Sequence, residues 1–230
     1  MTDPLARAVW SSLTSHHTRF ATGTPLALRF HKDVSPFAAS KDDSPESLKA
    51  LASLVGPEND SIYLMQADAI VLPDTLVAGT SRPGVMLVKQ TSPVLPASEE
   101  TIEKLSAEDS AQMRALAALT KPGPFLARTH ELSQFCGIKQ DGKLVAMAGE
   151  RVRLPGYSEI SGVCTHPDYR GRGYAAKLSA FIAEQITARG ETPFLHSWAD
   201  NDGAISLYRK LGFEINRDVN VAVVSRADAP

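Results

Sequence analysis

The chain has 230 residues, of which 43% are hydrophobic and 22% are charged, and its net charge at neutral pH is −2. These proportions are typical of a folded globular protein, and the near-neutral charge gives no electrostatic reason to expect nucleic-acid binding. The sequence holds no apolar run that is long enough to span a membrane, and its first residues show no basic segment followed by an apolar core. We therefore expect a cytoplasmic protein that does not bind membranes.

The first part of the chain shows only a weak pattern of elements. Three segments resemble strands and one between them resembles a helix: 26–31, 61–65 and 85–90 for the strands, and 44–55 for the helix. Pro93 and Pro96 then precede Ser98 and two glutamates, which is typical of a linker followed by a helix start. We therefore predict an N-terminal α+β region at 1–97 and a second domain at 98–230.

The second region shows alternating strands and helices with clear turn signals. Asp141-Gly142 between two apolar runs predicts a hairpin, and Gly190 predicts the end of a helix. In chain order we expect one or two helices within 102–119, strands at 135–139, 143–153 and 158–165, a helix at 171–189, a strand at 193–198, a helix at 201–211 and a strand at 213–224.

The turn between the strand at 158–165 and the next helix indicates a phosphate site. Gly171 and Gly173 carry no Cβ, so that a phosphate group can approach the backbone closely. The start of a helix presents unpaired N–H groups and partial positive charge, to which Arg170 and Arg172 add. We therefore expect a ligand that carries phosphates.

Two common phosphate-binding motifs explain this turn poorly. The sequence contains no G-x-x-x-x-G-K-[ST] pattern. Gly171, Gly173 and Ala176 do match the G-x-G-x-x-A form of the dinucleotide fingerprint, but a lone match is weak. The dinucleotide fold also places its fingerprint at the first strand, and too few elements follow here.

The same residues fit another signature better. Arg170-x-x-Gly173-x-Ala175 resembles the Q/R-x-x-G-x-G/A signature of the GNAT superfamily of acyl-CoA-dependent N-acyltransferases. A second block is similar to the family's second conserved block: Asn201-x-x-Ala204-x-x-x-Tyr208-x-Lys210-x-Gly212-Phe213. The resemblance covers roughly residues 100–224, and two blocks at the expected separation are more specific than either alone.

This resemblance implies an α+β fold in three layers, with a mixed, mostly antiparallel sheet and a cofactor-binding strand that splays away from its neighbour. The element order predicted above agrees with that fold. For residues 1–97 two alternatives stay open. They form either a degenerate GNAT-like half without the cofactor signature or an unrelated α+β region that packs on the catalytic half.

The resemblance also implies which residues bind the acyl-CoA. The backbone of the splayed strand would hold the pantetheine arm, and the glycine turn would hold the pyrophosphate. Asn201 resembles the family's cofactor-contacting asparagine, although an ordinary N-cap would explain it equally well. The candidates are Val163, Cys164, Thr165, Arg170, Gly171, Arg172, Gly173, Tyr174, Ala175 and Asn201.

Acyl transfer to an amine also needs groups that move protons. Tyr208 lies where the family often has its general acid, and a packed aromatic side chain is the alternative explanation. For the general base we favour Glu159, which strand alternation places on one face with Val163 and Thr165. Glu150 and His196 are the alternatives.

The cysteines and histidines show no pattern that is typical of a nucleophile or a metal site. Cys136 and Cys164 do not make a metal site, and a disulfide is unexpected in the cytoplasm. We interpret Cys164 as a small buried hydrophobe rather than a nucleophile. The six histidines show neither H-x-x-x-H nor H-E-x-x-H spacing, so we predict no metal.

The function implied is transfer of an acetyl group from acetyl-CoA to a primary amine of a small molecule, amino acid or peptide. Two alternatives stay open. One is a non-catalytic acyl-CoA-binding regulatory module, and the other is an enzyme of the same fold that uses another acyl-CoA donor. We expect a monomer or homodimer.

Overall fold

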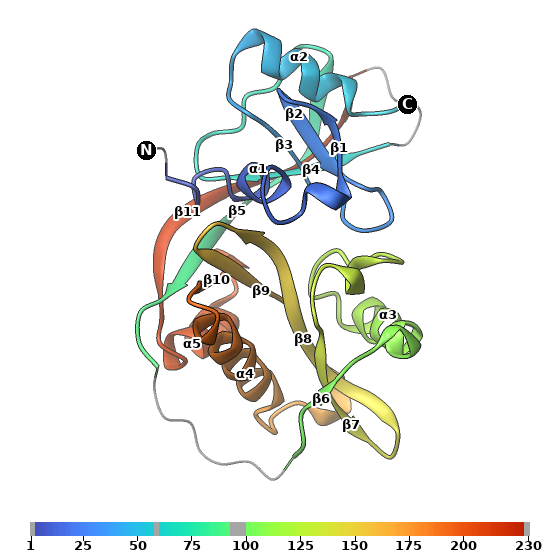
Figure 1. The fold of residues 1–230 in the computed structure, drawn as a ribbon, viewed down its shortest axis with the longest axis vertical. Helices are drawn as coiled ribbons and strands as arrows, with labels where there is room; N and C mark the ends of the chain where they lie inside the picture. The colour runs from blue at the N-terminus through green and yellow to red at the C-terminus, as the bar shows by residue number, and fades with distance from the viewer. Residues whose placement is uncertain (1–2, 58–59, 93–99, 228–230) are drawn as a thin grey trace.

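The structure is a computed structural model that describes residues 3–57, 60–92 and 100–227 (Figure 1). Its N-terminal elements are α1 (Ala8–Leu13), β1 (Ala21–Thr24), β2 (Ala27–Phe30), β3 (Ala38–Ser40), α2 (Pro45–Ser53), β4 (Ile62–Gln66) and β5 (Leu76–Lys89). Its C-terminal elements are β6 (Glu103–Lys104), α3 (Ser110–Thr120), β7 (Cys136–Gln140), β8 (Lys143–Leu154), β9 (Tyr157–Thr165), α4 (Tyr174–Ala188), β10 (Thr192–Trp198), α5 (Asp202–Lys210) and β11 (Phe213–Arg226).

The described strands form a small sheet and a large one. The small sheet has the order β1-β2-β3, and the large sheet has eight strands in the order β4-β11-β5-β10-β9-β8-β7-β6. In the large sheet β9 and β10 run parallel, and the other neighbours are antiparallel. The mixed, mostly antiparallel sheet expected from the sequence is therefore confirmed.

Helices cover both faces of the large sheet and so make three layers. Leu178 and Ile182 of α4 pack with Ile160 of β9 on one face, where α5 also lies. On the opposite face Met113 of α3 packs with Cys164 of β9. Helix α1 covers the same face as α3, farther toward the N-terminal sheet (Figure 1).

Most elements predicted in the C-terminal region are confirmed, with two changes at helix starts. The helix expected from 102 begins only at Ser110, because residues 103–104 form the edge strand β6. The helix expected from Gly171 begins at Tyr174, because Gly171 and Gly173 have left-handed φ angles of 79° and 78° and belong to the preceding turn. Asp141 and Gly142 form the hairpin turn, also with positive φ.

The N-terminal region contributes strands to both sheets. Strand β5 lies between β10 and β11 in the large sheet and reaches with β11 up to the small sheet, where β4 joins them (Figure 1). The large sheet is therefore built from strands of both regions. The linker at 93–99, which contains the predicted boundary, lies outside the described residues.

His17 is buried in the N-terminal region and makes the fold sensitive to acid. Its ring packs against Phe20 and Phe30, and its Nδ1 atom lies 2.8 Å from the Ser12 hydroxyl. Burial lowers its pKa from 6.5 to about 4. Between these values the unfolded state binds more protons than the native state, so the free energy of unfolding falls as the pH drops.

We expect this fall to reach roughly 3 kcal/mol between pH 6.5 and pH 4, since one unit of pKa difference corresponds to about 1.4 kcal/mol. Urea unfolding at a series of pH values measures it. His17→Gln removes the titrating group and should flatten the pH dependence in this window. Equal slopes for the two proteins would contradict the assignment to His17.

Candidate active site

The parallel strands β9 and β10 are paired over a short stretch and then separate. Residues 192–194 lie opposite residues 157–159. Beyond this point, among the residues that the structure describes, β9 is paired with β8 alone and β10 with β5 alone. The facing edges therefore leave backbone N–H and C=O groups without a strand partner. The splayed strand implied by the resemblance is confirmed.

A cleft of about 860 Å³ opens where the two strands separate and reaches both faces of the sheet. On the face of α4 it is bordered by the turn after β9 and by the start of α5. On the opposite face it is bordered by residues 120–124 after α3 and by the N-terminal region. Ligands could thus enter from two sides and meet at the gap between the strands.

Most residues predicted as site residues lie along this cleft. They are Val163, Cys164, Thr165, Arg170, Gly171, Gly173, Tyr174, Ala175, Asn201 and Tyr208. Glu159 and Arg172 do not border it. Arg172 instead stacks its guanidinium on the Tyr169 ring, 4.9 Å from the ring centre.

The glycine turn leaves open space next to the first turn of α4. A Cβ built on Gly171 or Gly173 meets no atom within 4 Å, and both residues border the cleft. Gly173 is the N-cap of α4 and supplies no side-chain cap. The first N–H groups of this helix therefore face a space that an anion can occupy, and Arg170 adds positive charge at its edge.

A β-bulge at Gly162 changes the faces of β9. Gly162 has a φ of 66°, and three residues of β9 span the same length as two of β8, since Cys164 lies opposite Met147 and Ser161 opposite Gly149. After the bulge Val163 packs on the α4 face, whereas Cys164 packs on the α3 face. The prediction that Glu159 shares a face with Val163 and Thr165 was therefore wrong, because simple alternation does not continue through a bulge.

Tyr208 lies on α5 with its ring packed edge-on against Phe213, at a centroid distance of 6.1 Å. It is 9% exposed, and burial raises its pKa to about 12. The phenol therefore keeps its proton throughout the physiological pH range. Asn201 caps the same helix, because its Oδ1 accepts a hydrogen bond from the Ala204 N–H at 3.2 Å.

Glu159 is held inside the protein rather than in the cleft. Its side chain is 1% exposed, and Arg151 donates two hydrogen bonds to it, at 2.9 Å from Nε and 2.5 Å from Nη2. The nearby Arg151 and His196 outweigh the effect of burial and lower the pKa of this carboxyl to about 2. A carboxylate that is this acidic and this fully hydrogen-bonded is a weak proton acceptor.

His196 is the third member of this group and borders the cleft. Its Nδ1 atom lies 2.7 Å from Oε1 of Glu159. Because the carboxylate is ionised, it accepts this bond from Nδ1–H, which leaves Nε2 as the basic nitrogen of the ring. Glu150, the other carboxylate considered from the sequence, accepts hydrogen bonds from Ser158 and Arg189 and does not border the cleft.

Among the described residues, neither the cysteines nor a group of metal ligands indicates a second kind of reaction. Burial raises the pKa of the Cys164 thiol to about 11, so that it is protonated at neutral pH. Within residues 3–57, 60–92 and 100–227 there is no group of three or more histidine, cysteine or acidic side chains placed to hold a metal ion. In the same part of the chain no helix combines the length and apolar character needed to cross a membrane.

Several residues of the cleft were not predicted from the sequence. Phe37, Tyr63 and Met65 come from the N-terminal region, and Val219 and Val221 come from β11. No motif marks them, because the pairing of β4 with β11 brings them to the cleft across more than 150 residues of chain. The N-terminal region thus forms part of the wall of the candidate site.

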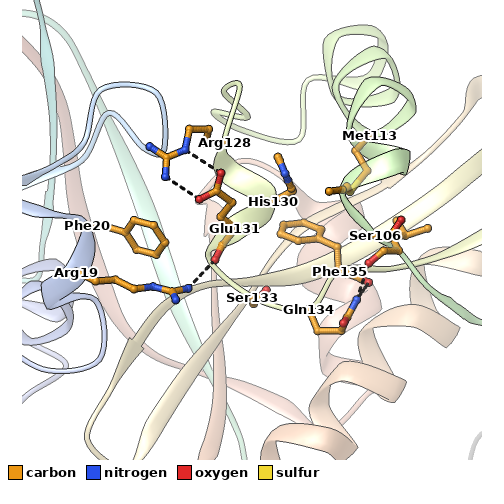
Figure 2. Close-up of a pocket in the computed structure, with 12 residues that line it drawn as sticks. Arg19, Phe20, Ser106, Met113, Arg128, His130, Glu131, Ser133, Gln134 and Phe135 are labelled. Atoms are coloured by element: carbon orange, nitrogen blue, oxygen red, sulfur yellow. Dashed lines mark hydrogen bonds and ion pairs between the residues drawn. The ribbon is translucent and has the colours of Figure 1, made fainter.

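A second cavity, of about 590 Å³, lies between the turn at Thr18–Phe20 and residues 128–135 (Figure 2). Hydrogen bonds hold its two arginines and Glu131 in place. Arg128 donates to both carboxylate oxygens of Glu131, at 2.8 and 2.7 Å, and Arg19 donates to the Glu131 backbone carbonyl at 3.1 Å (Figure 2). The Arg19 contact joins the N-terminal region to the loop before β7. Neither the splayed strands nor the glycine turn border this cavity, so we assign the site to the cleft.

Comparison with known proteins agrees with this geometry. The FR47-like protein family model matches residues 135–222. The N-alpha-acetyltransferase RimI of Mycobacterium tuberculosis is 34% identical over 100 residues, which are 40% of this chain and 62% of that protein. An acetyltransferase of Sodalis glossinidius is 44% identical over 80 residues, 32% of this chain and 56% of that protein. The matches thus span less than two thirds of these two relatives.

A solved structure matches over the whole length. It is a protein of Novosphingobium aromaticivorans described as an acetyltransferase of the GNAT family, with a TM-score of 0.90 and 36% identity over 98% of this chain and 100% of that chain. A GCN5-related N-acetyltransferase of Kribbella flavida shares the fold, with a TM-score of 0.68 and 20% identity over 97% of this chain and 96% of that one. With its splayed strand and glycine turn, the chain belongs to the GNAT family.

Proposed function

We propose that this protein is an N-acetyltransferase that moves an acetyl group from acetyl-CoA to a primary amine by direct attack in a ternary complex. The observation that carries the proposal is that the splayed strands, the glycine turn and Tyr208 all border one cleft. The relatives from Mycobacterium tuberculosis and Sodalis glossinidius, both named as acetyltransferases, support it.

The cleft has the groups that an acyl-CoA needs. The first turn of α4 and Arg170 would hold the pyrophosphate, and the free edge of β9 from Val163 to Thr165 would hold the pantetheine amides. Thr165 borders this edge, and its buried hydroxyl has no hydrogen-bond partner among the described residues. A ligand amide would satisfy that hydroxyl. Bound acetyl-CoA supplies a thioester carbonyl that an amine can attack.

The side chains around the gap supply the proton transfers. Nε2 of His196 would accept one proton from the amine as the new C–N bond forms. Glu159 would keep the imidazole ring oriented through its hydrogen bond to Nδ1. Tyr208 would give its proton to the thiolate that leaves when the C–S bond breaks. In this scheme Glu159 is a positioning residue, and His196 takes the role of base that the sequence favoured for Glu159.

Binding of acetyl-CoA tests the proposal first. Calorimetric titration with acetyl-CoA should show saturable binding, with NADH as the negative control. Thiol release with a panel of amines then separates an enzyme from a non-catalytic binding module, and propionyl- and succinyl-CoA test other donors. Absence of acetyl-CoA binding would refute the proposed function.

Replacing His196 tests the proposed base. We expect His196→Asn to lower kcat at pH 7 by about 30-fold, below the 10²-fold or more that acid–base groups often contribute, because some neutral amine reaches the site unaided. The deficit should shrink as the pH approaches the pKa of the amine. Steady-state rates between pH 6 and pH 10 measure both effects.

The matched control is His130→Asn, since His130 borders the separate cavity of Figure 2. This control should keep the wild-type pH profile. Glu159→Gln, which retains a side chain of similar shape, should lower kcat in the same pH-dependent manner as His196→Asn. A pH-independent loss in both variants would instead indicate a structural role for the pair.

A further inference from the structure

The face of the cleft away from α4 and α5 has an apolar wall. Phe37 and Tyr63 lie edge-on at a centroid distance of 5.8 Å, and the two residues form a β-bridge. Met65 lies opposite Val221 of β11 in the sheet, and both border the cleft. Because the glycine turn and α5 border the cleft on the other face, this wall faces the space in which an acceptor would lie.

The charged groups on this face are basic. Among the described residues that border the cleft there is no aspartate or glutamate, whereas Lys121 and Arg151 are present. Lys121 is exposed at the end of α3 and forms no ion pair within the described part of the chain. An acceptor with additional positive charge would find no carboxylate to pair with here.

Arg151 contacts the apolar wall and lies beside the loop that carries Lys121. Its guanidinium stacks on Phe37, 4.7 Å from the ring centre, while Nε and Nη2 bind Glu159. The remaining nitrogen, Nη1, points toward the loop after α3, since it lies 4.0 Å from a Cβ built on Gly123. Nη1 and Lys121 therefore lie at the same loop, beside the apolar wall.

We infer that the acceptor is an α-amino acid with an apolar side chain. Its side chain would pack on Phe37, Tyr63 and Met65, and its carboxylate would bind Arg151 Nη1 and Lys121. Its amine would then lie toward His196, at the gap between the strands. This inference rests on the proposed acetyl transfer. In it, the N-terminal region selects the acceptor.

Matched acceptors test the inference at saturating acetyl-CoA. We expect kcat/KM to be at least about tenfold higher for leucine than for isoamylamine, which lacks the carboxylate, or for glycine, which lacks the side chain. A loss of this size is usual when a substrate lacks one of the groups that a site binds. Spermidine should be a poor acceptor. Thiol release gives the rates, and mass spectrometry identifies the acetylated product.

Two variants connect the preference to the structure. Tyr63→Ala should raise KM for leucine about tenfold and reduce the preference for leucine over glycine. Lys121→Met should reduce the preference for leucine over isoamylamine, whereas Lys143→Met, at an exposed position of the β7–β8 hairpin, should not. Acetyl-CoA titration of each variant shows whether the cofactor side is intact.

The outcomes separate this inference from the proposed function. Acetyl-CoA binding with faster turnover of isoamylamine or spermidine than of leucine would overturn the inference and leave the proposed function standing. Binding with no turnover of any apolar amino acid would also overturn it. Absence of acetyl-CoA binding would refute the proposed function itself.

Discussion

Replacing Gly173 by glutamate should weaken acetyl-CoA binding by about 10³-fold or more. Gly173 borders the cleft at the N-cap of α4, and a side chain there would extend into the space beside the first N–H groups of the helix. A carboxylate in that position would both fill the space and repel the pyrophosphate, and like charges brought together cost several kcal/mol. A loss of about 4 kcal/mol corresponds to 10³-fold in Kd.

The control for this variant is Gly142→Glu. Gly142 has a φ of 76°, close to the 78° of Gly173, and its Cβ position is equally open, but it lies in the β7–β8 turn away from the cleft. Both variants should share a destabilisation of roughly 1–2 kcal/mol from the left-handed backbone. Calorimetry should therefore show lost binding in Gly173→Glu alone. Wild-type affinity in that variant would refute the phosphate site at this turn.

The C-terminal elements could be predicted because local signals specify them. The Asp141-Gly142 turn favours positive φ at both positions, and α4 carries Leu178 and Ile182 at helical spacing on its buried face. The glycine turn was located for a similar reason, since its conformation depends on residues that are adjacent in the chain. These parts of the site can be predicted from the sequence without knowledge of residues that are distant in the chain.

The N-terminal elements were predicted only in part. The strands expected at 26–31 and 61–65 and the helix expected at 44–55 are confirmed as β2, β4 and α2, whereas α1, β1 and β3 were not predicted. Strand β5 was expected only from residue 85, since Gly79, Pro83 and Gly84 interrupt the apolar pattern before it. Its pairing with β11 nevertheless extends from Leu76 to Lys89. Long-range pairing of this kind overrides local propensity, and it was not visible in the sequence.

The role of Glu159 illustrates the same limit within the site. The sequence placed an acidic residue on the correct strand, but its partners Arg151 and His196 lie on two different neighbouring strands. Their approach depends on the registers of β8, β9 and β10. The bulge at Gly162 then decides which residues of β9 share a face with Glu159. The registers have no marker in a single sequence, whereas Gly162, an isolated glycine within a strand, is the signal that could have indicated the bulge.

Replacing Tyr208 by phenylalanine should lower kcat by about 10²-fold, within the range for acid–base groups. Phenylalanine keeps the ring that packs on Phe213, so the fold and acetyl-CoA binding should be retained. Because the pKa of Tyr208 is about 12, the wild-type rate should show no loss from its ionisation at any pH below about 10. Stopped-flow or steady-state thiol release measures the change in kcat.

Tyr157→Phe is the matched control, since Tyr157 lies on β9 and packs against Phe194 outside the cleft. It should leave kcat within about twofold of the wild type, because phenylalanine keeps the ring that packs on Phe194 and the lost hydroxyl does not border the cleft. An unchanged kcat in Tyr208→Phe would remove the phenol from the mechanism. A loss confined to the Kd of acetyl-CoA would make Tyr208 a binding group, and the thiolate would then take its proton from another donor, such as water in the cleft.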